Sequence, residues 1–317
     1  MGSLAIMTQE VLLQKVRSLF LDAGFRVSER CSQRPRSFDL IAGEREILVV
    51  IKATSHIDGV SEDIARDLDL VSYYLGGAPL IIGERTRDAE LQRGAVYVRY
   101  GIHAISVPTL SDFLIEGVPP LVYVSPGGLY VNIDETLFRT LREEKELSLG
   151  DLAHLLGVSR RTISKYENGM GTTMEVALRI EELFDTAVAK PIDLLKHESR
   201  FAESRSAEPS GPAQGETLAD LGRMGMEIHL LRRAPFEALA RYDRETILTG
   251  YGTPQHVVKR APLIGNLSRV ANAHALCVLI GYRRQKTIGN TLVIGEERLH
   301  HLEDGSELME LIRGPPV

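Results

Sequence analysis

The sequence has no tryptophan, only two cysteines and no long apolar run. The cysteines, Cys31 and Cys277, lie far apart, which fits a reducing compartment and excludes a cysteine-rich zinc site. The longest apolar runs, such as residues 47–51 and 275–281, have the length of strands and are too short to cross a membrane. We therefore expect a cytoplasmic protein with no membrane association.

Signals for secretion and for nucleotide cofactors are also missing. No basic segment leads into an apolar stretch at the N-terminus, so we expect no secretion signal. The sequence lacks the glycine-lysine pattern of a P-loop and the glycine fingerprint of a dinucleotide site. We predict no cofactor. The net charge of −6 argues weakly against a polyanion binder, but it does not exclude a locally basic surface that binds DNA.

With 317 residues, the chain is long enough for two or three domains. Residues 1–133 alternate between helix and strand patterns, which is typical of an α/β domain. The expected helices are residues 8–23 and 60–75, and the expected strands are residues 38–42, 47–52, 78–83, 95–100 and 103–107. Residues 121–133 predict a β-hairpin around a Pro-Gly-Gly turn.

The rest of the chain divides into three further segments. Residues 134–196 have helix patterns throughout, and residues 197–215 are rich in Ser, Glu, Pro and Gly, which predicts a flexible linker. Residues 216–317 repeat the first domain, since "APFEALARYDRETILTGYG" resembles "RSFDLIAGEREILVVIKAT". The alternative is that two unrelated α/β units share this pattern by chance. The predicted fold is a pair of duplicated α/β units on either side of an all-α domain.

The helical segment contains "SLGDLAHLLGVSRRTISKYENG", in which two short helices are expected. Ser148 can cap the first helix, and Asp151 three residues later completes a capping box. The expected apolar side of this helix consists of three leucines, Leu152, Leu155 and Leu156. Gly157 is placed to end the helix in a left-handed conformation.

Ser159 is expected to cap the second helix of this pair. Ile163 and Tyr166 can point inward, whereas the outward side carries Arg160, Arg161, Thr162 and Lys165. Two short helices joined by a glycine turn form a helix-turn-helix, whose second helix enters the major groove of DNA. The alternative is a helical hairpin with a solvated basic face.

The pattern "LA…GVS…IS.YENG" resembles the Cro/CI (XRE) type of helix-turn-helix over residues 137–195. This resemblance implies that Arg160, Arg161 and Lys165 read bases, and that Ser148 and Asn168 contact phosphates. The full set of predicted DNA-binding residues is Ser148, Ser159, Arg160, Arg161, Thr162, Ser164, Lys165 and Asn168. The family commonly has a polar residue in place of Leu149. The layout of the whole chain is similar to a group of archaeal HTH-type transcriptional regulators.

Residues 37–52, "SFDLIAGEREILVVIK", resemble the core of metal-dependent nucleases of the restriction-endonuclease and resolvase type. Such nucleases need carboxylates that hold Mg²⁺ and a lysine near the attacking water. Asp39 and Lys52 occupy two of these positions, and Glu10 could be a third carboxylate. Val50 stands where a central carboxylate is required, and valine cannot bind a metal.

The repeat lacks even more of this pattern. Glu237 replaces Asp39, and the alignment places Thr249 at Val50 and Tyr251 at Lys52. Because the pattern fails in both copies, we predict a degenerate nuclease-like fold with no catalytic residue and no metal site.

The function that this sequence predicts is regulation of transcription through double-stranded DNA, without catalysis. A homodimer on a palindromic site is expected, because a single recognition helix reads too few bases. The α/β units could pair two chains or sense a small-molecule effector, whose identity is unknown. Two alternatives stay open: a structure-selective nuclease that uses the helix-turn-helix for targeting, and a helical unit that contacts only proteins.

Overall fold

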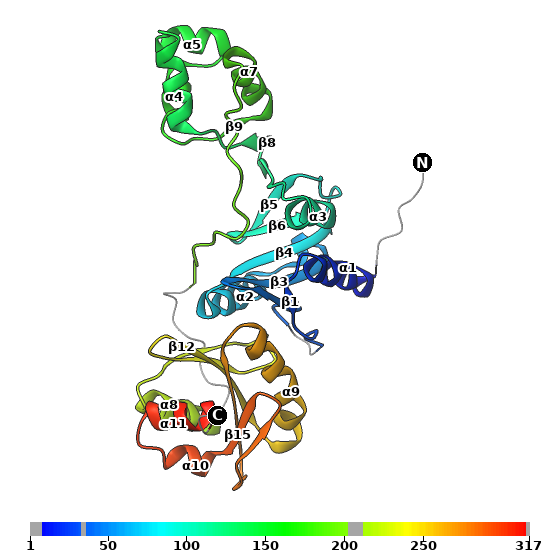
Figure 1. Ribbon diagram of the computed structural model, residues 1–317, viewed down its shortest axis with the longest axis vertical. Helices are drawn as coiled ribbons and strands as arrows, with labels where there is room; N and C mark the ends of the chain where they lie inside the picture. The colour runs from blue at the N-terminus through cyan, green and yellow to red at the C-terminus, as the bar shows by residue number, and fades with distance from the viewer. Residues whose placement is uncertain (1–7, 33–35, 202–211, 315–317) are drawn as a thin grey trace.

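The computed structural model of the protein describes residues 8–32, 36–201 and 212–314. The molecule is elongated, with the helices of the helical part (residues 134–196) at one end, the first α/β unit in the middle and the second α/β unit at the other end (Figure 1). The prediction of helices throughout residues 134–196 is wrong for residues 185–196, which form no helix and run back to the first unit. In the sequence the helical part lies between the two α/β units. In space it lies beyond the first one.

The first α/β unit has every helix and strand that its sequence pattern predicts, with shifts at their ends. It also has a short strand at residues 26–27, a 3-10 turn at residues 57–59 and a helix at residues 107–114 that were not predicted. Its elements are α1 (Gln9–Asp22), β1 (Arg26–Val27), β2 (Leu40–Glu44), β3 (Ile47–His56), the 3-10 turn η1 (Ile57–Gly59), α2 (Glu62–Leu75), β4 (Ala78–Arg85), β5 (Ala95–Arg99), β6 (Ile102–Ser106) and α3 (Val107–Leu114). Thr8 caps α1, and Gly76 ends α2 in a left-handed conformation.

The sheet of the first unit continues into the helical part. The predicted hairpin consists of β7 (Val122–Ser125) and β8 (Gly128–Val131), and β8 pairs with the short strand β9 (Thr172–Thr173). The resulting nine-stranded sheet has the order β1-β2-β3-β4-β6-β5-β7-β8-β9. The same sheet therefore extends from the first α/β unit into the helical part.

The helical part is joined to the first unit by two neighbouring chain segments. Beside β8, the returning segment forms backbone hydrogen bonds from Lys190 N to Asn132 O (2.7 Å) and from Ile192 N to Pro120 O (2.8 Å). Leu194 then enters the core of the first unit. Both the outgoing and the returning chain are thus attached to the same α/β unit.

The second α/β unit repeats the strand order of the first. Its elements are α8 (Pro212–Arg223), β10 (Glu227–Leu230), β11 (Ala238–Tyr242), β12 (Glu245–Gly252), α9 (Pro254–Val270), β13 (His274–Leu279), β14 (Lys286–Ile288), β15 (Thr291–Gly295), α10 (Glu296–His300) and α11 (Gly305–Arg313). The six-stranded sheet runs β10-β11-β12-β13-β15-β14, which is the order of the first six strands of the other sheet. The two units therefore have the same topology.

Strand register corrects the alignment between the two units. Leu40 pairs with Ile51 in the first hairpin, and Ala238 pairs with Thr249 in the second. Thr249 is therefore equivalent to Ile51, and the sequence alignment that placed it at Val50 is wrong by one residue.

The same correction applies to the following position, where Gly250 and not Tyr251 is equivalent to Lys52. Strands β3 and β12 are buried over most of their length. Because their apolar residues do not alternate with polar ones, the sequence pattern did not fix the register.

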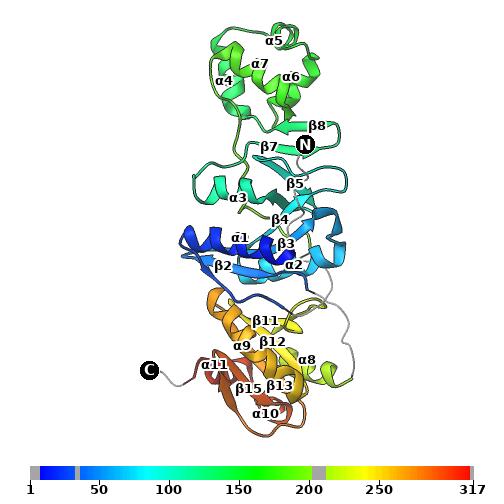
Figure 2. The same cartoon turned by 90° about the vertical axis from the view of Figure 1, so that its right-hand side faces the viewer.

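The two α/β units pack against each other in a reciprocal way. Helix α2 of the first unit contacts β11 of the second, and α9 of the second contacts β2 of the first (Figure 2). Phe38 and Phe236, both fully buried, face each other with ring centroids 6.4 Å apart. A single apolar cluster spans both units. This arrangement resembles a dimer of two equivalent units built into one chain.

The segment that follows the helical part begins against α2. His197 and Ser199 both form hydrogen bonds with the buried carboxylate of Asp69. Helix α8 begins at Pro212, inside the segment predicted as a linker. Residues 202–211 lie outside the described residues.

Candidate nucleic-acid interface

Four helices form the helical part: α4 (Glu135–Glu144), α5 (Leu149–Leu156), α6 (Arg160–Tyr166) and α7 (Met174–Phe184). Their shared core contains Phe138, Leu152, Leu156, Ile163, Tyr166, Ile180 and Phe184. This core is separate from those of the α/β units, so the four helices pack around a centre of their own.

Helix α5 begins with the predicted capping box. Ser148 Oγ accepts a hydrogen bond from Asp151 N at 3.1 Å, and Ser148 N donates to Asp151 Oδ2 at 3.0 Å. Hydrogen bonds from Ser148 lower the pKa of Asp151. Gly157 ends the helix with a φ of 67°, so both predicted ends of α5 are confirmed.

The predicted apolar side of α5 is wrong in one position. Leu152 and Leu156 are buried, but the Leu155 side chain is 53% exposed. Leu152 and Leu156 are four residues apart and share one face of the helix, whereas Leu155 lies about 100° from Leu156. The other helices cover only the face that carries Leu152 and Leu156.

Helix α6 follows the predicted turn and has the predicted orientation. Ser159 Oγ accepts a hydrogen bond from Thr162 N at 3.1 Å, so Ser159 caps the helix. Ile163 and Tyr166 are buried, and their burial turns the opposite side of the helix outward. That outward side carries the three cations Arg160, Arg161 and Lys165, all exposed.

Positive charge is concentrated on α6 even though the helical part is acidic. Residues 134–196 contain twelve Asp and Glu residues and nine Lys and Arg residues. Within the part of the chain that the structure describes, no ion pair involves Arg160, Arg161 or Lys165. These three side chains are therefore available to an external anion.

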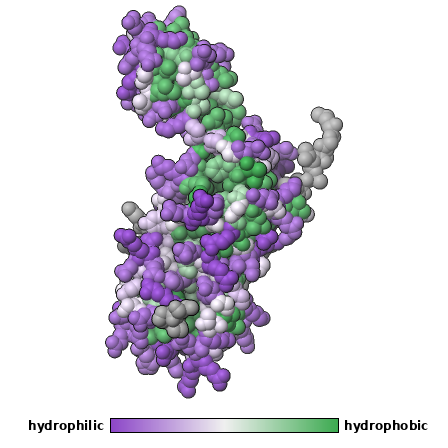
Figure 3. All heavy atoms as spheres, in the orientation of Figure 1, coloured by the Kyte–Doolittle hydropathy of each residue, from purple (hydrophilic) through white to green (hydrophobic). Residues whose placement is uncertain are grey.

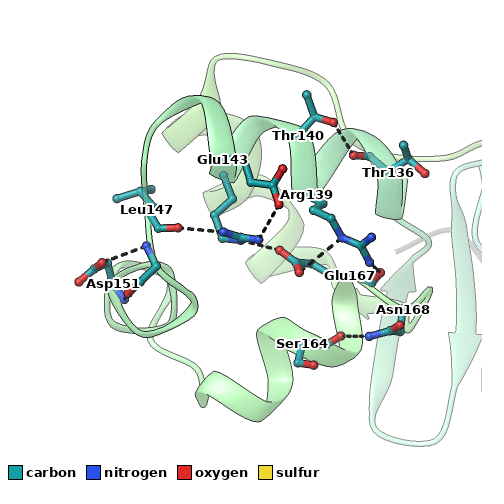
Figure 4. Close-up of polar contacts among 11 residues, drawn as sticks. Thr136, Arg139, Thr140, Glu143, Leu147, Asp151, Ser164, Glu167 and Asn168 are labelled. Carbon is teal, nitrogen blue, oxygen red and sulfur yellow. Dashed lines mark hydrogen bonds and ion pairs between the residues drawn. The ribbon is translucent and has the colours of Figure 1, made fainter.

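A buried carboxylate connects α4 to the end of α6. Arg142 Nε donates to Glu167 Oε1 at 2.6 Å, and Arg139 Nη2 donates to the Glu167 carbonyl at 2.8 Å (Figure 4). The same pairing raises the pKa of Arg142. Arg142 also donates to the carbonyl of Leu147 before α5. One arginine thus fixes the positions of both helices of the helix-turn-helix.

Sequence reasoning missed this support, because Glu167 lies 25 residues after Arg142 and no local pattern connects the two. The available signal was the pair Arg139 and Arg142, which lie three residues apart on one face of a helix. Nothing in the sequence indicates which acidic residue would meet them.

The remaining predicted contact residues lie within α6 and near the two ends of the motif. Asn168 is exposed after α6, and its Nδ2 donates to the carbonyl of Ser164 at 2.6 Å (Figure 4). Ser148 is exposed at the start of α5, while Thr162 and Ser164 are half-buried on α6. The structure therefore places the predicted residues on α6, on its two flanks and at the start of α5.

The nuclease-like position of the first unit holds a fully buried carboxylate. Asp39 Oδ2 accepts a hydrogen bond from Ala53 N at 2.9 Å and lies 3.4 Å from Lys52 Nζ. Arg36 forms a second ion pair with Asp39. Burial lowers the pKa of Lys52, whose Nζ also donates to the Arg36 carbonyl at 3.1 Å.

The arrangement around Asp39 does not fit a divalent cation. Val50 is buried in the core and offers no oxygen, and the Arg36 guanidinium already occupies one side of the carboxylate. Glu10 pairs with Arg30 on the surface. Among the described residues, no group of three or more His, Cys, Asp or Glu side chains is placed to hold a metal ion.

The equivalent position of the second unit uses a different cation. Glu237 Oε2 accepts a hydrogen bond from Tyr251 N at 2.8 Å, and Arg260 Nη1 on α9 donates to Glu237 Oε1 at 2.6 Å. Each unit thus keeps a carboxylate that accepts one backbone N–H and is neutralised by nearby cations.

The helices that the structure describes include none that combines the length and the apolar character needed to cross a membrane.

Two protein families match separate parts of the chain. A PD-(D/E)XK superfamily domain matches residues 9–120, and a helix-turn-helix matches residues 138–190. The first match covers the nuclease-like sheet and α1 to α3, and the second covers the helical part. No solved structure matches the chain.

Relatives named "Putative HTH-type transcriptional regulatory protein" are similar over nearly the whole chain. The relative from Methanoregula boonei is 60% identical over 96% of this chain and 96% of its own length. The relative from Methanosphaerula palustris is 59% identical over 96% and 99%, and the one from Methanosarcina barkeri is 39% identical over 96% and 97%.

Proposed function

Because the chain belongs to the archaeal family of HTH-type transcriptional regulatory proteins that these relatives represent, we propose that it regulates transcription by binding double-stranded DNA. The exposed cationic side of α6 carries this proposal. Its N-terminal end enters the major groove, and Ile163 and Tyr166 anchor its other side in the helical core.

The proposed contacts divide into base readers and phosphate binders. Arg160 and Arg161 lie in the first turn of α6, where an arginine can bond guanine O6 and N7 together. Lys165 lies one turn later and contributes a third cation. The proposed polar and phosphate contacts are Ser148, Ser159, Thr162, Ser164 and Asn168. The ion pair between Arg142 and Glu167 holds α6 in place for these contacts.

We further propose that the protein acts in the cytoplasm as a homodimer on a palindromic site, as Cro/CI-type regulators do. One α6 helix spans too few base pairs for specificity. Two copies that bind half-sites about one helical turn apart, roughly 34 Å, combine their contacts.

Substitution of the arginines tests the proposal directly. Arg160→Ala or Arg161→Ala should weaken binding by about 1–3 kcal/mol, or roughly 5- to 150-fold, and relax base preference at one position of the site. Fragments selected from genomic DNA supply the site, and a gel-shift series measures affinity. Arg17→Ala, which removes an exposed arginine from α1, is the matched control. Variants that bind as tightly as the control, or a wild-type protein that binds no DNA at low salt, would contradict the proposal.

The PD-(D/E)XK match favours a second candidate function, a nuclease that the helix-turn-helix directs to DNA. The ion pair between Arg36 and Asp39 argues against it, because a guanidinium occupies the carboxylate that would bind Mg²⁺. Plasmid and branched DNA incubated with Mg²⁺ or Mn²⁺ separate the two functions. Cleavage that Asp39→Asn abolishes would support the nuclease, and intact DNA supports the regulator.

A further inference from the structure

Helix α7 has two apolar faces, of which only one is covered. Ala177, Ile180 and Phe184 are buried in the helical core. Met174 and Leu178, which lie one turn apart, are 42% and 52% exposed. Because they are four residues apart, their side chains form a continuous apolar stripe on the outside of the helix.

This stripe continues onto the segment that leads into the hairpin of β7 and β8. A cavity of about 330 Å³ is lined by Met174, by residues 118–122 and by Leu129 on β8, together with residues 92–95, Thr109 and Asp112. Val118 and Leu121 are themselves exposed. Figure 3 shows apolar residues that run from the helical part over the region of β8 onto the first α/β unit. We call Val118, Leu121, Leu129, Met174 and Leu178 the α7 face.

Charged side chains of both signs border the α7 face. Glu175 and Arg179 lie four residues apart on α7 and pair at 2.6 Å. Both are partly exposed, with the Glu175 side chain mostly in solvent. Contiguous apolar surface with a polar rim is typical of a protein–protein contact.

We infer that the α7 face binds a second copy of this chain through an antiparallel pair of α7 helices. In a twofold contact, if one residue meets another, the reverse contact also forms. Met174 then packs against Leu178 of the second copy, and Glu175 faces Arg179 of the second copy. Met174 and Leu178 are four residues apart, and so are Glu175 and Arg179. In an antiparallel pair of identical helices, apolar side chains therefore meet apolar ones and each acid meets a base, which favours an identical partner over an unrelated one.

This inference rests on the proposed function, in which two recognition helices bind one palindromic site. The contact uses none of the α6 cations, so Arg160 and Arg161 stay exposed for DNA. Helix α7 contacts α5, β8 and β9 in its own chain. A dimer formed through α7 therefore holds each helix-turn-helix in a fixed orientation.

An apolar substitution on the α7 face tests the surface. Leu178→Asp in the full chain should raise the dimer dissociation constant about 30-fold or more, because it places a charge in an apolar contact. Leu155→Asp is the matched control, since Leu155 is equally exposed but lies on α5. Sedimentation equilibrium without DNA measures the dissociation constant, and circular dichroism checks the fold of both variants.

Charge reversal gives a sharper test, because mixing two variants can restore the dimer without restoring the ion pair between Glu175 and Arg179 within either chain. Glu175→Arg alone gives two cations that repel those of an identical copy, and Arg179→Glu alone gives two anions that do the same. Each variant should be monomeric at concentrations where the wild type is dimeric. A mixture of the two variants should form heterodimers, because cations then face anions although each chain keeps its own like-charge pair.

The outcomes separate this inference from the proposed function. A wild-type monomer, a dimer that Leu178→Asp leaves intact, or a variant mixture that stays monomeric overturns the inference. DNA binding that depends on Arg160 and Arg161 would leave the proposed recognition of DNA standing in each of these cases, and a wild-type monomer would also contradict the proposed homodimer. An α7-dependent dimer that binds no DNA would do the reverse.

Discussion

The two α/β units share strand order and the position of one carboxylate, but they neutralise it in different ways. Asp39 pairs with Arg36 and Lys52 from its own sheet and the segment before it. Glu237 pairs with Arg260 from helix α9. The shared feature is the hydrogen bond from a strand N–H, that of Ala53 or Tyr251, to the carboxylate. The comparison indicates that this carboxylate is kept for its link to the neighbouring strand, because the cations around it differ.

The units also differ where they meet each other. Helices α2 and α9 end in equivalent ways, since Gly77 N donates to Ser72 O and Ala273 N donates to Ser268 O. The second unit binds the end of α2, because Arg241 and Thr246 donate hydrogen bonds to the carbonyl of Tyr74. The end of α9 instead packs closely against the backbone of β2 at Gly43, the position equivalent to Arg241.

The largest expected difference between the units concerns their carboxylates. Asp39→Ala should destabilise the protein by about 3–5 kcal/mol, because it leaves Arg36 and Lys52 buried without their anion. Glu237→Ala should cost about 1–3 kcal/mol, since its side chain is 26% exposed and water can reach Arg260 more easily. Urea denaturation of both variants measures the free energies of unfolding. Equal losses would show that the two sites are energetically equivalent and would break the comparison.

A smaller difference is expected at the two helix ends. A Cβ atom at Gly43 would lie 2.8 Å from the backbone oxygen of Val270, which cannot move without shifting α9. Gly43→Ala should therefore cost about 1–3 kcal/mol. Arg241→Ala, which removes a stacking contact on Tyr74 and a long hydrogen bond, should cost about 0.5–1 kcal/mol. Thermal unfolding of the two variants gives the order, and a larger loss for Arg241→Ala would contradict it.

The smallest expected effect is on pH dependence, and it belongs to α2 alone. Asp67 accepts hydrogen bonds from Arg232 N and Arg233 N of the second unit, whereas Leu263 holds the equivalent place on α9. Burial raises the pKa of Asp67 above 3.8. The native state then binds a proton more readily than the unfolded state, so this contribution is present below pH 3.8 and is lost as pH rises through the raised pKa.

Asp67→Asn removes that titration and should therefore change the slope of stability against pH in this window. Relative to the wild type, the variant should gain stability as pH rises from 3.8 through the raised pKa. Unfolding free energies measured in urea at a series of pH values give the difference. A difference that stays constant with pH would indicate that Asp67 titrates normally.

Local features of the fold could be predicted from the sequence. The capping box of Ser148 and Asp151, the left-handed Gly157 and the cap at Ser159 depend on a few neighbouring residues, and all three are present. The burial of Ile163 and Tyr166 follows from helical periodicity in the same way.

Features that depend on distant segments could not be predicted. The ion pair of Arg142 with Glu167 joins positions 25 residues apart, and the contact of Phe38 with Phe236 joins the two units. The buried faces of α2 and α9 have the same apolar pattern whether they cover their own sheet or a neighbouring unit. Periodicity shows that a face is covered, but it does not identify the partner.

The two segments that attach the helical part affect which spacing between DNA half-sites the proposed homodimer can bind. If a single segment attached the helical part, it could rotate about that segment. Here the outgoing and returning segments are paired, so rotation of the helical part would break hydrogen bonds such as the one from Lys190 N to Asn132 O. In the proposed homodimer, two helical parts attached in this way would keep a fixed rotational position relative to each other along the duplex. An insertion of roughly five base pairs between the half-sites, which is half of a helical turn, would carry one half-site to the opposite side of the DNA. A helical part that cannot rotate would then not reach that half-site.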